Sequence, residues 1–206
     1  MLFRSQVVAA AWTEVGTTGM WQAGVQPFLA QFGLASGFNT LFVDGQRAQR
    51  AREPDVGYYT IVSVNPLTSL TAFRFTSGNI SAAWANLTDV EIVHYQQWQS
   101  PRMRIASVNN GTKTVTLAAP LIPGRGYDWD YGGPSAGTSR YYVENFLEGL
   151  DTPGEWYLNR HTGVLYYRPL PGQDIPSAMF TAPVTEQLVN LTGTSHVAFS
   201  GLEFAP

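Results

Sequence analysis

Glycine and proline punctuate this sequence from end to end and leave little room for long helices. The chain has 20 glycines and 13 prolines among 206 residues, and both types interrupt helices. Two short segments remain as helix candidates, residues 26–32 and 142–150. The second would place Glu144 and Glu148 four residues apart on one helix face. Each segment would be a short connector and not part of a helix bundle.

Strand signals dominate the rest of the chain. Apolar or alternating runs cover residues 41–43, 58–64, 90–98, 102–108 and 113–119. Such runs are typical of strands, because alternate side chains of a strand share a face. Asp44-Gly45 closes the first run as a turn. Asn110-Gly111 lies between the last two, and this dipeptide favours the positive φ angles of a type I′ hairpin turn.

A second hairpin is predicted nearer the C-terminus. Residues 155–158 and 164–167 are rich in aromatic and aliphatic side chains, and a polar loop at residues 159–163 joins them. From residue 188 onward the pattern changes to short apolar pieces broken by Gly193 and Gly201. The sequence therefore predicts an all-β fold, with a strand-rich barrel or sandwich-like domain built from hairpins.

Composition excludes several classes of function. Charged residues make up only 13% of the chain and the net charge is −3, so no basic field exists to collect nucleic acid or an anionic membrane. The absence of cysteine rules out disulfides, thiol catalysis and thiolate metal sites. No metal site is expected from His94, His161 and His196, because they share no ligand spacing. No cofactor is expected.

Neither a signal peptide nor a membrane span is predicted. The apolar run at residues 7–12 is short and follows a single basic residue, Arg4. No apolar stretch reaches the roughly 18 residues that a spanning helix needs. The sequence leaves the cellular location open.

Several ordered segments resemble one family. They are residues 41–47, residues 50–54, Trp98 with Arg102 and Ile105, residues 142–145, residues 153–167 and residues 196–204. Together they resemble the N-terminal region of right-handed parallel β-helix proteins of the pectate-lyase-like superfamily. Some members are glycoside hydrolases with fucosidase or xylanase activity, and the parent proteins are often secreted or periplasmic.

This resemblance implies a domain organisation. Residues 1–183 would form the strand-rich domain, and residues 184–206 would form the first, apparently truncated, rung of a parallel β-helix. The catalytic carboxylates of the family would lie on later rungs, so no catalytic residue is carried over. The chain would be an accessory part of an enzyme acting on plant-type polysaccharide, with carbohydrate as its partner.

Three groups of residues are candidate sites in their own right. Asp128 and Asp130 flank Trp129, and two carboxylates so close could serve as acid and base. Ser135 fits a G-x-S-x-G pattern, with His161 as a possible base, but no apolar strand precedes the serine and no helix follows it. Trp129, Tyr127 and Tyr131 could form an aromatic platform for a sugar ring. For each group, an ordinary surface loop is the simpler interpretation.

Arg47, Arg50 and Arg52 form a short basic run. They are expected to make ion pairs with Glu53, Asp55 or a carboxylate elsewhere in the fold.

Two alternatives to the accessory-domain function remain open. One is a small autonomous esterase with Ser135 as its nucleophile. The other is a structural module that assembles through its open rung, since apolar residues at 188–204 would lack a cover. The sequence predicts either a homo-oligomer formed through this segment or a segment folded back onto the hairpin of residues 157–167.

Overall fold

The computed structural model describes residues 5–64, 71–95, 100–120, 137, 139–185, 187 and 189–201. Within them the chain is all-β, as predicted, with 15 strands, one α-helix and two 3-10 helices. The α-helix, α1 (Gln26–Gln31), confirms the first predicted helix and buries Phe28 and Leu29. None of the helices in these ranges is long and apolar enough to cross a bilayer.

The first sheet has eight strands. In spatial order they are β1 (Ser5–Val7), β15 (Phe180–Pro183), β4 (Leu41–Val43), β5 (Gln46–Arg50), β13 (Glu155–Asn159), β14 (Val164–Tyr167), β3 (Trp21–Gly24) and β2 (Trp12–Glu14). Every neighbouring pair is antiparallel except β5 and β13, which run parallel. This sheet combines strands from both ends of the chain.

The second sheet is built from the middle of the chain. Its order is β6 (Arg52–Glu53), β12 (Arg140–Glu144), β9 (Glu91–Tyr95), β10 (Arg102–Asn109), β11 (Thr114–Leu117) and β8 (Ala72–Arg74). Strand β7 (Tyr59–Thr60) also pairs with β12. The predicted strand at residues 58–64 is therefore shorter than expected, with one further bridge at Ser63.

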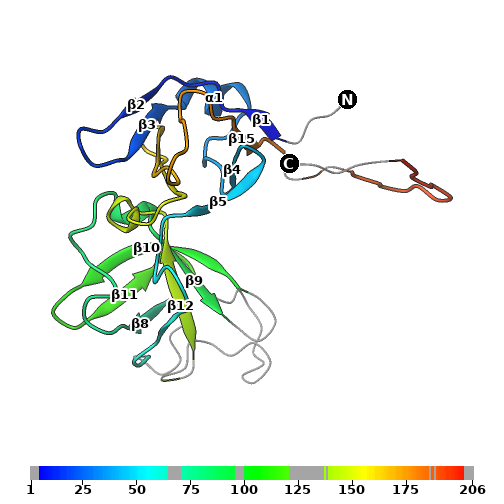
Figure 1. Ribbon diagram of the computed structural model, residues 1–206. Helices are drawn as coiled ribbons and strands as arrows, with labels where there is room; N and C mark the ends of the chain where they lie inside the picture. The colour runs from blue at the N-terminus through cyan, green and yellow to red at the C-terminus, as the bar shows by residue number, and fades with distance from the viewer. Residues whose placement is uncertain are drawn as a thin grey trace.

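The second sheet is an insertion into the first. The chain leaves the first sheet after β5, crosses at Ala51, builds the second sheet, and returns from β12 to β13. Figure 1 shows the two sheets one above the other, with β5 leading from the upper to the lower one. Consequently the two crossings lie side by side and form a junction between the sheets.

Each sheet packs its own core. The core of the first sheet includes Trp156, Leu158 and Leu165, and that of the second includes Phe73 and Tyr141. A small third cluster of buried residues, namely Ala51, Leu150 and Tyr157, lies where the chain crosses. Apolar burial therefore stabilises each sheet separately, and the junction needs other contacts.

The predicted helix at residues 142–150 is wrong. Residues up to Glu144 belong to strand β12, and only a 3-10 helix, η2 (Leu147–Gly149), follows. Tyr141 and Val143 are fully buried in alternate positions of β12, so the period of two prevails over the helical spacing. Glu144 is buried, whereas Glu148 is exposed and accepts a hydrogen bond from the backbone of Ala85.

Both predicted hairpins are present, but one turn differs. Neither Asn110 nor Gly111 has a positive φ angle, and the loop runs over four residues to Lys113, whose φ is 55°. The Asn109 side chain accepts a hydrogen bond from Thr112 N at 3.0 Å and holds this longer loop. The two-residue turn with both φ angles positive occurs instead at Asp44-Gly45, between β4 and β5.

The described residues after β15 do not fold back onto the hairpin, so this one of the two predicted alternatives is wrong. No described residue after Pro183 belongs to a strand, and Val189, Leu191, Val197 and Phe199 are 45–55% exposed. Figure 1 shows this orange-to-red segment leaving the body of the molecule. The hairpin has no free edge to receive it, since β5 pairs with β13 and β3 pairs with β14.

Candidate functional site

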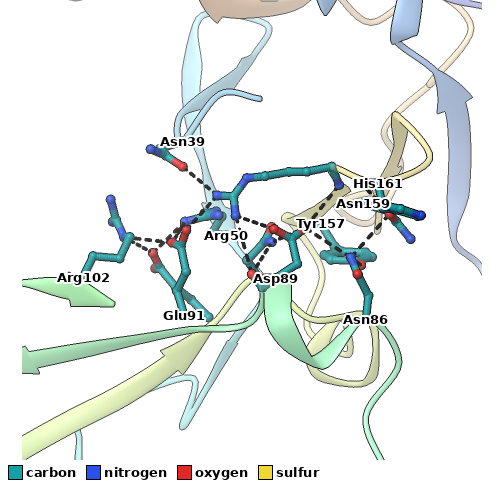
Figure 2. Close-up of polar contacts among 12 residues, drawn as sticks. Asn39, Arg50, Asn86, Asp89, Glu91, Arg102, Tyr157, Asn159 and His161 are labelled. Carbon is teal, nitrogen blue, oxygen red and sulfur yellow. Dashed lines mark hydrogen bonds and ion pairs between the residues drawn. The ribbon is translucent and has the colours of Figure 1, made fainter. Parts of the chain in front are cut away.

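Charged side chains gather at the junction between the sheets (Figure 2). Arg50 ends β5, Glu91 begins β9 and Glu144 ends β12. Arg50 Nη1 donates to Glu91 Oε2 and to Glu144 Oε1, each at 2.7 Å. All three side chains are at most 7% exposed, so one buried guanidinium from the first sheet joins two carboxylates of the second.

Two further arginines complete the network. Arg160, in the loop between β13 and β14, donates through Nη2 to Glu91 Oε1 at 2.9 Å and through Nη1 to Asp89 Oδ1 at 2.8 Å. Arg102, which is 38% exposed, reaches both Glu91 and Glu144. Three arginines therefore balance three carboxylates, which is the condition under which buried charge is tolerated.

Amide side chains hold Asp89 from both sides. Asp89 belongs to η1 (Leu87–Asp89), the first of the two 3-10 helices in the described residues. Asn145 donates to the Asp89 carbonyl at 3.1 Å. Asn86 donates to Asp89 Oδ2 at 3.2 Å and to the Tyr157 hydroxyl at 3.3 Å. Because Tyr157 lies on β13, these bonds also cross from one sheet to the other.

Within this network, the charges around Glu91 make it unsuited to act as a general acid. Burial raises the pKa of Glu91, but the Arg50 and Arg160 guanidiniums outweigh it and hold this pKa below its usual range. A general acid must carry a proton near neutral pH, which Glu91 does not. The network therefore fixes the two sheets relative to each other.

Two hollows share lining residues of strand β5. The arginine hollow, of about 310 Å³, is lined by Asn39, Arg47, Ala48, Gln49, Arg50, Arg52, Arg102, Tyr142 and Glu144. The glutamine hollow, of about 410 Å³, is lined by Val43, Asp44, Gln46, Arg47, Ala48, Gln49, Thr152, Pro153, Gly154, Glu155, Tyr167, Leu170 and Gln173. Residues 47–49 of β5 line both, so the two hollows are neighbours.

Glu155 supplies a buried carboxyl group to the glutamine hollow. Glu155 is fully buried, and this burial raises the pKa of its carboxyl group to about 7. Gln49 Nε2 donates to Glu155 Oε1 at 3.0 Å, and Thr152 N donates to Oε2 at 3.3 Å. These two bonds lower the pKa and limit the shift.

His161 lies at a third hollow, of about 230 Å³, together with Asp89, Arg104 and Arg160. Its backbone N–H donates to Asn159 Oδ1 at 3.0 Å, and its side chain is exposed. The Asp89 carboxylate beside it is already bonded by Arg160 and Asn86. Ser36 and Thr88 also line this hollow, and the role predicted for His161 as a base stays a prediction, because Ser135 lies outside the described residues.

An acidic group was not anticipated from the sequence. Carboxylate oxygens of Glu53, Asp55 and Asp151 lie within 4.8 Å of one another. Burial, followed by the charges of Asp151 and Asp55, raises the pKa of Glu53. Thr152 Oγ1 donates to Asp55 Oδ2 at 2.9 Å, so part of the group is already bonded within the fold.

Comparison with known proteins identifies a family that matches this chain. The sequence profile of the GH141 insertion domain matches residues 19–170, about three quarters of the chain. The chain belongs to the GH141 insertion domain family. No curated protein matches it. A solved structure entitled "Glycoside hydrolase" is similar in fold, with a TM-score of 0.71 at 22% identity. The match covers 92% of this chain and 33% of that one, so the chain spans about a third of that protein's length.

The family match covers the described strands of the second sheet, the junction and five of the eight strands of the first sheet. The six network residues, Arg50, Asp89, Glu91, Arg102, Glu144 and Arg160, all lie within residues 19–170. The arginine and glutamine hollows lie almost wholly in the same range. The junction is thus a feature of the insertion domain itself.

Most candidate residues from the sequence lie outside the part of the chain that the structure describes. These are Asp128, Asp130 and Ser135, together with Tyr127, Trp129 and Tyr131. The expected ion pairs of the basic run are confirmed for Arg50, with partners far along the chain. Glu91 was missed, although a charged residue inside the apolar run of residues 90–93 is a signal of a buried partner.

Proposed function

We propose that this chain is the accessory domain of a carbohydrate-active enzyme of the glycoside hydrolase type, acting on plant-type polysaccharide and contacting the glycan weakly. The observation that carries the proposal is the family match over residues 19–170. The fold similarity to one third of a glycoside hydrolase chain supports it. A junction whose buried carboxylates are all paired with arginines is consistent with a supporting and not a catalytic role.

The two hollows beside β5 would supply the glycan contact. Protein sites for sugars combine hydrogen-bonding groups with apolar faces. The glutamine hollow offers the exposed side chains of Gln46 and Gln49 alongside the exposed apolar side chain of Leu170. An aromatic platform of Trp129, Tyr127 and Tyr131 remains a second proposed contact.

Affinity gel electrophoresis with xylan, pectic and neutral plant polysaccharides tests this function. We expect one or more of these polymers to retard the 206-residue chain, and the chain alone to release no sugar from them. Gln46→Ala, at an exposed side chain in the glutamine hollow, should reduce the retardation. Trp129→Ala tests the platform in the same gel. Hydrolysis by the isolated chain, or migration unaffected by every polymer, would contradict the proposal.

The proposal extends to the terminal segment, residues 184–206. We propose that residues 184–206 form the first rung of a parallel β-helix and that following chain covers Val189, Leu191, Val197 and Phe199. Those residues expose apolar surface that a packed rung would bury. Light scattering of the full chain and of residues 1–183 tests it. We expect self-association in the full chain only, weakened by Phe199→Lys. A monomeric full chain at high concentration would count against it.

A further inference from the structure

The arginine hollow carries more positive charge than its surroundings neutralise. Four arginines line it, against one carboxylate, Glu144. The charges of Arg50 and Arg102 are neutralised by their ion pairs with carboxylates of the junction. Arg47 and Arg52 are therefore surplus, in a chain whose overall net charge is −3.

The two surplus arginines differ in how they are held. Arg52 donates through Nε to the Pro54 carbonyl at 3.0 Å and through Nη2 to the Gly57 carbonyl at 2.8 Å. Its guanidinium also stacks on the Tyr142 ring, 3.9 Å from the centroid. These partners are neutral, so Arg52 is fixed in place with its charge uncompensated. Arg47 is exposed, and within the described residues no ion pair is recorded for it.

A fixed guanidinium and an exposed one that line the same hollow suit a small planar anion. Arginine binds carboxylate through paired N–H donors in one plane. Asn39 and Gln49 line the same hollow and can hydrogen-bond to hydroxyl groups. Its volume of about 310 Å³ is at the lower end of the range for small-ligand pockets, about 300–1,000 Å³. The site therefore matches a sugar that carries a carboxylate.

We infer that the arginine hollow binds the carboxylate of a uronic acid within an acidic glycan, while neighbouring sugars lie over β5 toward the glutamine hollow. This inference rests on the proposed glycan-binding function and names its substrate class. Arg47 and Arg52 hold the carboxylate, and residues 47–49 link the two hollows. The net charge of −3 gives the chain no long-range attraction for anions, so recognition of the uronate depends on the local arginines of the hollow.

The test is calorimetric titration of the chain with a tetramer of galacturonic acid and with its fully methyl-esterified form. These probes differ only at the carboxyl groups, which are ionised in the acid and are neutral methyl esters in the other form. We expect the acid to bind and the ester to bind at least tenfold more weakly. Added salt should weaken the binding of the acid and leave the binding of the ester unchanged. Arg47→Gln should reduce affinity for the acid about tenfold. Arg104→Gln, an equal loss of charge at the third hollow, should leave it within twofold.

Each outcome separates this inference from the function beneath it. Equal binding of acid and ester, or full affinity in Arg47→Gln, would overturn the uronate site and leave glycan binding intact. Failure of the acid tetramer to bind, when a neutral polysaccharide still retards the chain in gels, would do the same. If no glycan binds, both the uronate site and the proposed glycan-binding function are overturned. Binding of inorganic phosphate or sulfate as tightly as the tetramer would show a general anion site and would also overturn the assignment to a sugar.

Discussion

Glu155 on β13 and His94 on β9 are buried titratable groups, one from each sheet, and they differ in their hydrogen-bond partners. Glu155 on β13 of the first sheet is fully buried, accepts hydrogen bonds from Gln49 and Thr152, and has its pKa raised to about 7. His94 on β9 of the second sheet is also fully buried. Neither of its ring nitrogens has a partner within the described ranges, and burial lowers its pKa to about 4.

Inside each sheet, burial disfavours the charged form of a titratable side chain, whereas at the junction the buried side chains stay charged. Burial without an opposite charge favours the neutral form of an acid or a base. Burial beside opposite charges keeps the ions, as Arg50, Glu91 and Glu144 do. Within the described residues, the sheets therefore bury neutral polar groups internally, and the ion pairs lie at the junction between the sheets.

The largest expected effect comes from breaking the junction. Arg50→Met should lower the free energy of unfolding by about 3–5 kcal/mol, because it leaves Glu91 and Glu144 buried with a lost partner. Arg102→Met is the matched control and should cost under about 1 kcal/mol, since Arg102 is partly exposed. Urea denaturation measures both. Equal small losses in the two variants would show that the network does not join the sheets.

Glu155→Gln should change the pH dependence of stability. The folded pKa of about 7 exceeds the ordinary value of 4.5, so the folded state binds the proton more tightly. Stability from this group is fully present below pH 4.5 and is lost as pH rises through 7, by up to about 3 kcal/mol. The variant should lack this fall. Denaturation from pH 4 to 8 measures it, and an unchanged slope would contradict the raised pKa.

His94→Leu should produce the opposite change in slope. The folded pKa of about 4 lies below the ordinary value of 6.5, so the unfolded state takes up the proton first. Stability therefore falls as pH drops from 6.5 toward 4, by up to about 3 kcal/mol. The His94→Leu variant should lose less unfolding free energy than the wild type as pH falls. His161→Gln, at an exposed side chain, should match the wild type. In the wild type the two slopes largely cancel between pH 4.5 and 6.5. A shared slope in both single variants would refute that cancellation.

The smallest effects come from the two hairpin loops, one from each sheet. Lys113 and Gly163 occupy equivalent positions, with φ angles of 55° and 66°. Lys113→Gly should gain about 0.5–1 kcal/mol by relieving the strain of a side chain in the left-handed region. Gly163→Ala should cost about 1–2 kcal/mol, because it adds that strain and its Cβ would lie 2.3 Å from Gln26 Cγ. Thermal unfolding of both variants checks the pair, and changes of the same sign would contradict it.

The sequence by itself determined the all-β class, helix α1, and the existence of both hairpins. These follow from local rules, since glycine and proline break helices and alternation places every second side chain in a core. Local rules failed where two patterns competed. Asn110-Gly111 carries the residues of a tight turn, yet the Asn109 side chain holds a longer loop, while Asp44-Gly45 forms the tight turn instead.

Only the tertiary structure decided the junction and the hollows. Arg50 meets Glu91 and Glu144 across 41 and 94 residues of chain, and no periodicity in the sequence relates positions so far apart. The partners meet because the second sheet is inserted between β5 and β13, which brings both crossings to one place. The ion pairs, the uncompensated charge of Arg47 and Arg52, and the perturbed groups Glu155 and His94 all depend on what burial places around a side chain.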